Sequence, residues 1–599
     1  MIRLAFDIET NGLPRKGMSC VHCIVTKNLD TGQILRYNDS GTHESVTTGV
    51  NMLAEADFLV GHNVIGFDVP ALQEIYPFFQ PTAKIFDTLI LSRMFYPDIL
   101  SIDYRKRPVA MPMKLFGRHS LEAWGYRLGD YKGEFGKDTD WSEWSQEMED
   151  YCEQDVHVVE TLFRQVFEEK KGNPLEKHSQ AIDLEHRLAI IMAKQEAAGW
   201  PFDVESAQKL ESTLRTEMDK LADQMRDTFP HVDGGLMTPK RNNKTKGYLE
   251  GVSFCKLKEF NPTSRQHIGW AFATFRGWKP EQFTDTGAPK IDEGVLQAID
   301  TNESKTFARI LELQKALGQL SDGTNAWLKM VTNQGRIHHT CQLATNTGRN
   351  AHSRPNLGQT SSDPRCRQLF GPGSNMRQAA ADASGLELRM LGHYLSYFDG
   401  GAFADVVVNG DIHQQNADRV GCTRKEVKTL TYAFIYGASD KKIGSSLDKS
   451  LNETDAKKLG KKIRAKFLAA IPGLEGLLDA IGNRAESDII VGLDGRPIKL
   501  QGKKHAALNY LLQSAGAIVC KRWNVILYDW FQEQGYIWGV DYQWLGWIHD
   551  EIQLAVKPQL TEDVKFALEW SIVQAGEYYN LKVPLAGEAK DGETWADCH

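Results

Sequence analysis

Residues 424–437 form the most specific segment of the chain and read Arg424-Lys425-Glu426-Val427-Lys428-Thr429-Leu430-Thr431-Tyr432-Ala433-Phe434-Ile435-Tyr436-Gly437. Positions 424, 428, 432 and 436 are spaced by four and hold two cations followed by two tyrosines. On a helix these side chains form a slowly drifting stripe that is cationic at its start and aromatic at its end. Cations placed in this way can hold a triphosphate, and Tyr432 can stack against a base or sugar. An ordinary amphipathic helix is the alternative, but it would not need two cations and two tyrosines at this spacing.

Two acidic positions lie on either side of this segment. Asp382 follows the apolar run Arg377–Ala381 and precedes a predicted helix, Leu386–Leu395, so we expect it at the end of a strand. Asp550 lies between two alternating runs within residues 544–556, which predict a β-hairpin with Asp550 at its turn. Two carboxylates from separate strands can hold two Mg²⁺ ions, which lower the pKa of an attacking hydroxyl and stabilise a transferring phosphoryl group.

A second acidic set occupies the first part of the chain. Asp7 and Glu9 alternate in a predicted strand and therefore point to one face, where they repel unless a cation lies between them. Asp68 begins a predicted helix, and Tyr151 and Asp155 are spaced by four on another. Four carboxylates and a tyrosine in this order predict two Mg²⁺ ions about 4 Å apart, with Tyr151 positioning an attacking water. Ordinary surface acids are the alternative, since Asp-x-Glu alone is common.

The bulk composition allows a multidomain globular protein. A chain of 599 residues is too long for one core, and 41% hydrophobic with 25% charged residues is an ordinary balance. No leader peptide and no apolar run of membrane-spanning length are visible, so we expect a cytoplasmic protein with no membrane partner. The net charge of −8 does not exclude a nucleic-acid partner, because basic residues cluster at 240–246 and 457–466. A solvated helix face is the alternative for the second cluster.

The segment between the two acidic sets predicts a helical connection. Residues 180–198 indicate a long amphipathic helix that Gly199-Trp200-Pro201 interrupts, and residues 206–228 indicate another helix. Residues 233–248 lack apolar periodicity, so we expect a helix pair with a flexible basic tip that grips duplex backbone. We place the domain boundary between Lys171 and Pro174, where Lys-Gly-Asn-Pro breaks the preceding helix.

Together these segments resemble family A DNA polymerases that carry a DEDD-type 3′–5′ proofreading exonuclease. Residues 382–389, 424–437 and 549–551 are similar to the polymerase motifs A, B and C. The resemblance covers essentially the whole chain and is greatest to the replicative polymerases of T-odd bacteriophages. It implies an α/β and α+β multidomain fold with an RNase H-like exonuclease domain at about 1–172 and a right-hand polymerase domain at about 173–599. The implied thumb is about 200–330, the palm about 331–410 and 485–599, and the fingers about 411–484.

The resemblance also implies the role of individual residues. Metal ligands would be Asp7, Glu9, Asp68 and Asp155 in the nuclease and Asp382, Ala383 and Asp550 in the palm. Each site would hold two Mg²⁺, and Mn²⁺ can substitute. Nucleotide contacts would be Ala383, Glu387, His413, Arg424, Lys428, Tyr432 and Tyr436. DNA contacts would be Arg349, Asn356, Asn509, Gln513 and His549, with Lys240, Arg241 and Lys244 on the backbone.

Three residues or segments give sharper expectations. Glu387 resembles the family's steric gate, which excludes a ribose 2′-hydroxyl. Tyr432 stands where other members carry phenylalanine, and a tyrosine there goes with acceptance of dideoxynucleotides. Only about thirty residues separate Phe229 from Phe260, too few for the long thumb insertion with which the best-known T-odd enzyme recruits thioredoxin, so we do not expect thioredoxin as a partner.

Primer–template DNA and dNTPs are the expected partners. We expect a monomer that copies a phage genome, together with a replicative helicase–primase and a single-stranded DNA-binding protein. Three other functions share part of this pattern. A single-subunit RNA polymerase would need neither Glu387 nor the nuclease, and a non-catalytic DNA-binding module would not need both sets of carboxylates. A repair enzyme shares the same chemistry, although proofreading favours replication.

Overall fold

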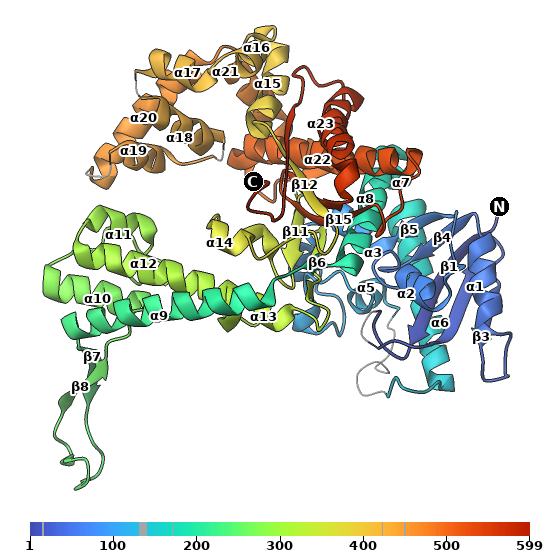
Figure 1. The fold of residues 1–599 in the computed structure, drawn as a ribbon, viewed down its shortest axis with the longest axis horizontal. Coiled ribbons are helices and arrows are strands. Elements are labelled where there is room, and N and C mark those ends of the chain that lie inside the picture. Colours follow the sequence, from blue (N-terminus) through green and yellow to red (C-terminus); the bar gives the residue numbers. More distant parts are fainter. Residues whose placement is uncertain are drawn as a thin grey trace. The chain divides into compact units, whose positions relative to one another are not determined.

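The computed structural model describes residues 1–14, 17–130, 140–170, 172–284, 286–421, 423–435, 437–448 and 451–599. The chain divides into two compact units (Figure 1). The first contains Met1–Trp200, His338–Gln359 and Gly371–His599, and the second contains Pro201–Ile337 and Thr360–Phe370. The boundary expected between Lys171 and Pro174 falls inside the first unit, and the segment expected as the thumb overlaps the second.

A mixed five-stranded sheet forms the amino-terminal part of the first unit, with the strand order β3-β2-β1-β4-β5. Its strands are β1 (Arg3–Thr10), β2 (Val21–Asn28), β3 (Ile34–Asn38), β4 (Phe58–Gly61) and β5 (Lys84–Asp87). The β1 strand pairs antiparallel with β2 and parallel with β4, and is therefore central.

Side chains of β1 alternate between two cores. Leu4, Phe6 and Ile8 pack with α1 (Val46–Glu55) and α2 (Asp68–Ile75) on one face of the sheet. Ala5 packs on the other face with α6 (Gln146–Leu162). The strand period of two therefore places Asp7 and Glu9 on the α6 face, as predicted from the alternation.

The helix α8 (Ser179–Ala198) joins this sheet to the rest of the first unit, and the predicted helix over 180–198 is confirmed. Ala181 and Ile182 belong to the same core as the α6 face of the sheet. Leu184, Leu188 and Met192 belong to the large core of the carboxy-terminal part. The other helices of this region are α3 (Thr88–Phe95), α4 (Ile99–Lys106), α5 (Leu121–Leu128) and α7 (Pro174–Lys177).

A buried ion network fixes the inner face of α8. Glu185 Oε1 accepts hydrogen bonds from Lys521 Nζ at 2.6 Å and from an Arg496 guanidinium nitrogen at 2.5 Å. Arg496 also pairs with Asp494, and all four side chains are buried. Because an unpaired buried charge costs several kcal/mol, each member depends on the others.

A four-stranded antiparallel sheet forms the centre of the carboxy-terminal part, with the strand order β15-β16-β12-β17. Its strands are β12 (Arg377–Ala383), β15 (Tyr542–Ile548), β16 (Glu551–Val556) and β17 (Gly587–Gly592). The predicted strand before Asp382 and the predicted hairpin around Asp550 are both confirmed. Around the sheet lie α15 (Leu386–Asp399), α22 (Ala507–Glu533) and α23 (Thr561–Tyr578). Trp523 on α22 donates its indole N–H to the Leu568 carbonyl on α23.

A helical segment lies in the sequence between β12 and α22. It contains α16 (Ala402–Asn409), α17 (Ile412–Val420), α18 (Arg424–Ile435), α19 (Asp440–Leu447), α20 (Glu453–Ala470), α21 (Leu474–Ala485) and the hairpin β13 (Ile489–Val491) and β14 (Pro497–Lys499). Glycines let α19 and α20 cross closely, because a Cβ at Gly444 would lie 1.8 Å from the Ala456 carbonyl oxygen. The helix expected over the most specific segment is confirmed as α18.

The second unit is built on α9 (Val204–Thr228), which confirms the helix predicted over 206–228. The other elements are α10 (Arg265–Arg276), α11 (Glu293–Ile299), α12 (Asn302–Leu317), α13 (Trp327–Met330) and the strands β7 (His231–Met237) and β8 (Phe254–Glu259). The expected flexible tip is wrong for residues 233–237, which belong to an antiparallel hairpin (Figure 1). Both faces of this hairpin are largely exposed, so backbone pairing forms it without any apolar period.

Among the helices that the structure describes, none is both long and apolar enough to cross a bilayer.

Stability in acid is expected to depend on the buried histidine His339. Burial, together with the neighbouring His352, lowers its pKa to about 3. The folded chain therefore keeps His339 neutral while the unfolded chain takes up a proton near pH 6.5, so stability is lost as the pH falls below 6.5. We expect roughly 3 kcal/mol from this group between pH 6.5 and pH 4.

The measurement is the melting temperature between pH 7 and pH 4. His339→Gln should lose less stability over this range than the wild type, because glutamine does not titrate and can still bond to Gln195. Parallel pH profiles for the two proteins would show that His339 does not contribute.

Candidate active sites

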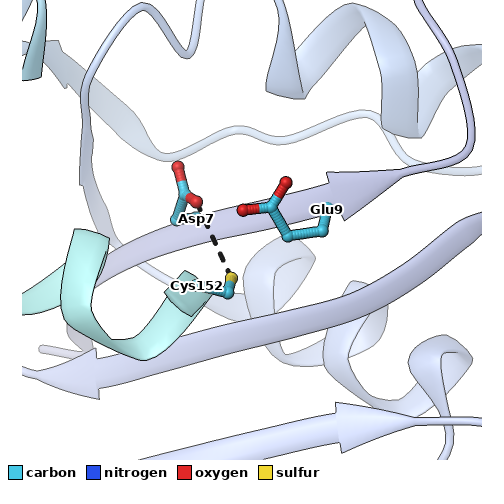
Figure 2. A group of neighbouring side chains, drawn as sticks. All are labelled: Asp7, Glu9 and Cys152. Atoms are coloured by element: carbon cyan, nitrogen blue, oxygen red, sulfur yellow. Dashed lines mark hydrogen bonds between the residues drawn. The ribbon is translucent and has the colours of Figure 1, made fainter. Parts of the chain in front are cut away.

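The nuclease candidate site begins with two carboxylates and a thiol. Figure 2 shows Asp7 and Glu9 projecting from β1 beside Cys152 of α6. Their ligand atoms all lie within 4.8 Å of one another, and Cys152 Sγ donates to Asp7 Oδ2 at 3.7 Å. The sequence reasoning identified the two acids but missed Cys152, which no spacing rule connects to β1.

Two further acids are buried beside this pair. Asp68 is 3% exposed and Asp155 is 5% exposed. The Asp68 carboxylate accepts the backbone N–H of Ile8, which lies between Asp7 and Glu9, so it reaches the same strand. Burial, together with the charges of Asp87 and Asp155, raises the pKa of Asp68 to about 8.

These groups fit a divalent cation. In the described part of the chain, Asp68 Oδ1 is buried without a hydrogen-bond partner. A buried oxygen that repels its neighbours is stabilised by a hard cation, which prefers carboxylate ligands. The donor set therefore suits a metal. The strand period brings Asp7 and Glu9 together, and the Ile8 contact brings Asp68 to the same strand.

The loop before Asp68 is held by a buried residue that sequence reasoning missed. Asp87 accepts the backbone N–H groups of Asn63 at 2.8 Å and Ile65 at 3.2 Å. Its own N–H donates to His186 Nε2 at 2.9 Å. This network fixes the loop that leads into α2, so it positions Asp68 at the first residue of that helix.

Tyr151 lies one turn before Asp155 on α6, as its spacing predicted. Its ring meets Trp141 edge to face, with the ring centroids 6.4 Å apart.

The palm candidate site gathers carboxylates from three elements. Asp382 on β12 pairs with Glu551 on β16, and the N–H of Ala383 donates to the Asp550 carbonyl at 3.0 Å. Burial, together with the charges of Asp550 and Glu551, raises the pKa of Asp382 to about 6. Burial also raises the pKa of Asp550, with Glu387 of α15 as the next cause. The clustering of like charges fits a divalent cation here as well.

Glu551 is a further candidate residue of this site, to which the sequence motif gave no role. It is 5% exposed and accepts the indole N–H of Trp595 at 2.9 Å. Its other oxygen lies 3.3 Å from His599 Nδ1. These contacts hold the Glu551 carboxylate beside Asp382.

A cavity of about 250 Å³ opens beside these acids and is lined by Arg349, Glu387, His549 and Asp550, among others. Arg349 lies 3.8 Å from the Glu387 carboxylate. His549 adopts a left-handed backbone with φ 60° at the hairpin turn and contacts the Gly358 carbonyl at 3.0 Å. The structure therefore brings predicted nucleotide and DNA contacts to the two palm aspartates.

The helices α17 and α18 bring the predicted triphosphate contacts together. The rings of His413 and Tyr432 lie 6.3 Å apart. Asp411 caps α17 and accepts the Arg424 Nε–H at 2.7 Å. Burial lowers the pKa of His413, and Arg424 and Lys428 lower it further.

Tyr432 of α18 also lies near the acids of the palm site. Burial raises the pKa of its hydroxyl, with Glu387 and Asp550 as the next causes. Tyr436, the last residue of the predicted stripe, lies outside the described residues.

The predicted DNA contacts lie in three places. Asn509 and Gln513 are on α22, and the amide nitrogen of Asn509 is buried without a partner among the described residues. Asn356 is exposed in the segment before Gly358. The basic residues Lys240, Arg241 and Lys244 are exposed between β7 and β8 in the second unit.

Comparison with known proteins places this chain in a family. The family model "DNA polymerase family A" matches residues 237–597. The DNA-directed DNA polymerase of Escherichia phage T7 is 31% identical over 713 residues, covering 99% of each chain. That of Enterobacteria phage T3 is 32% identical over 716 residues, covering 100% of each.

A solved structure shares the fold. It is described as the POL domain of Pol1 from M. smegmatis in complex with DNA primer-template and dNTP. It matches with a TM-score of 0.75 and 17% identity, covering 100% of this chain and 96% of that chain. The family model matches more than half of the chain, and the phage relatives match its full length. Both findings agree with the geometry of the palm site and of α18, so the chain belongs to DNA polymerase family A.

Proposed function

We propose that the chain extends the 3′ end of a DNA primer on a template with dNTPs, and that its amino-terminal site removes mismatched 3′ nucleotides. The observation that carries polymerisation is the cluster of Asp382, Asp550 and Glu551 beside the cavity lined by Arg349. Family A DNA polymerases use divalent metal ions. Two Mg²⁺ ions per site, for which Mn²⁺ can substitute, fit the carboxylate pairs of both sites.

Asp382 and Asp550 would hold a metal in the palm, with Ala383 next to Asp382 in β12. The metal would supply charge stabilisation for the transferring phosphoryl group. Arg424, Lys428 and His413 bind the triphosphate as charge-assisted donors, which fixes the α-phosphate for attack. Glu387 at the cavity wall excludes a ribose 2′-hydroxyl by its bulk.

Asp7, Glu9, Asp68 and Asp155 would hold a metal in the nuclease, which would lower the pKa of an attacking water. Tyr151 would orient that water from the turn of α6 before Asp155. Because selection at one site is limited in free energy, a second hydrolytic site multiplies fidelity. Proofreading therefore supports a replicative role.

The remaining assignments follow from the relatives. We propose a nuclease domain over about residues 1–172 and a polymerase domain over about 173–599. The full-length similarity to phage polymerases supports replication of a phage genome in a bacterial host, by a monomer that works with a helicase–primase and a single-stranded DNA-binding protein. The exposed residues Lys240, Arg241 and Lys244 would grip the DNA backbone in place of a thioredoxin-bound insertion.

The test is a 5′-labelled primer annealed to a template, incubated with Mg²⁺ with and without the four dNTPs. Extension with dNTPs and 3′ shortening without them are expected. Shortening alone would overturn the polymerase assignment, and extension alone would overturn the nuclease assignment.

Tyr432→Phe is expected to make dideoxynucleotides poor chain terminators. The Tyr432 hydroxyl lies near Glu387 and Asp550, where it can replace the missing 3′-hydroxyl of a dideoxynucleotide. One such hydrogen bond corresponds to roughly a tenfold change in discrimination or more. The measurement is the ratio of dideoxynucleotide to deoxynucleotide incorporation, with Tyr397→Phe on the exposed part of α15 as the control. An unchanged ratio in Tyr432→Phe would contradict the assignment.

A further inference from the structure

A second cavity of the first unit is lined by residues that neighbour both candidate active sites. It measures about 220 Å³. On one side it is lined by Asn63 and Ile65 of the loop that leads to Asp68. On the other it is lined by the hairpin β10 (Thr340–Leu343) and β11 (Asn350–Ser353), with Arg354 following β11.

The side chain of Asn350 lines this cavity and also the palm cavity. Its amide nitrogen donates to the weak acceptor Cys341 Sγ at 3.7 Å. Its Oδ1 is buried without a hydrogen-bond partner in the part of the chain that the structure describes. A polar side chain with unused hydrogen-bonding capacity therefore stands where the two cavities meet.

Two arginines line the second cavity. Arg93 donates to the neutral Gln342 Oε1 at 2.7 Å, and Arg354 is exposed. Neither arginine forms a salt bridge within the part of the chain that the structure describes. Such guanidinium groups match phosphate oxygens in geometry and charge.

The acids lining the same cavity are largely engaged by the protein. Asp87 accepts backbone N–H groups of Asn63, Ile65 and its own helix α3. Glu185 is paired with Lys521 and Arg496. Glu196 accepts the Thr340 hydroxyl at 3.1 Å. Arg93 and Arg354 are the cationic residues of this lining, and the charge of Asp87 also acts on Arg93.

We propose that this cavity binds the phosphodiester backbone of the single-stranded primer end as it passes from the palm to the nuclease, with Arg93 and Arg354 as its phosphate contacts and Asn350 at the entrance. The inference rests on the proposed function, which requires one strand end to visit both sites. Single-stranded DNA suits the cavity because a charged groove that tracks the backbone binds it without reading sequence.

The test uses the full chain and a primer–template with a mismatched 3′ end. The protein is bound to labelled DNA, and Mg²⁺ is added together with excess unlabelled DNA, so that only transfer without dissociation leads to removal of the mismatch. In R93Q/R354Q we expect removal to fall about tenfold, since two charge-assisted contacts are lost. Hydrolysis of a single-stranded oligonucleotide and extension of a matched primer should stay within twofold of the wild type.

Arg105→Gln on α4 is the matched control, because Arg105 is an exposed arginine outside the cavity. R354Q alone alters an exposed side chain and should give a smaller fall in the same direction if the double variant folds poorly. Removal at the wild-type rate in R354Q and R93Q/R354Q would overturn the proposal, as would an equal loss on the single-stranded oligonucleotide. Failure of the proposed function is distinguishable, because the wild type would then fail to extend or shorten DNA.

Discussion

Asp550→Asn is expected to reduce primer extension by about 10³-fold or more while leaving 3′ shortening intact. Asp550 and Asp382 are the carboxylates that would hold the metal in the palm, and a loss of about 4 kcal/mol of charge stabilisation corresponds to this factor. Single-nucleotide incorporation under single-turnover conditions measures the chemical step.

The control for this variant is Asp563→Asn, which removes an exposed carboxylate from α23 and should extend primers normally. Extension by Asp550→Asn within tenfold of the wild type would show that this carboxylate does not hold the catalytic metal. A parallel loss of 3′ shortening would instead indicate that the substitution damages the fold.

The second large effect is expected from Asp7→Asn combined with Glu9→Gln. Both side chains lie on the α6 face of β1, so the pair of substitutions removes the negative charge that would attract the cation. We expect 3′ shortening to fall about 10³-fold and extension to continue, with copying errors rising about tenfold or more. The measurements are the release of labelled 3′ nucleotides and the error frequency of copied DNA.

Glu55→Gln on the exposed end of α1 provides the control for the nuclease variant. Normal 3′ shortening by the double variant would place the hydrolytic site elsewhere. An unchanged error frequency despite lost hydrolysis would mean that the site does not correct the primer being extended.

Periodicity in the sequence predicted the elements that carry the candidate sites. The alternation in β1 places Asp7 and Glu9 on one face, and the alternating runs around Asp550 form the expected hairpin. The helix with Tyr151 and Asp155 is also confirmed. The catalytic roles of these residues stay predictions, because element positions alone do not test them.

Long-range buried contacts could not be predicted in this way. The bond between Asp87 and His186 joins segments far apart in the sequence, and neither residue belongs to a motif. The thiol of Cys152 reaches the nuclease acids only because α6 packs across β1. The hairpin β7–β8 was missed because its stability comes from backbone pairing, which leaves no apolar period to detect.

The helix α8 determines how a proofreading-free version of this enzyme can be engineered. Its first turns complete the nuclease core through Ala181 and Ile182, and that core also includes Leu343 of β10. Deleting the amino-terminal sheet would therefore uncover apolar side chains that belong to the retained polypeptide, and it would leave His186 without Asp87. A shortened protein would be prone to aggregate. Silencing the nuclease by substitution, rather than by excision, is the route that keeps a usable reagent.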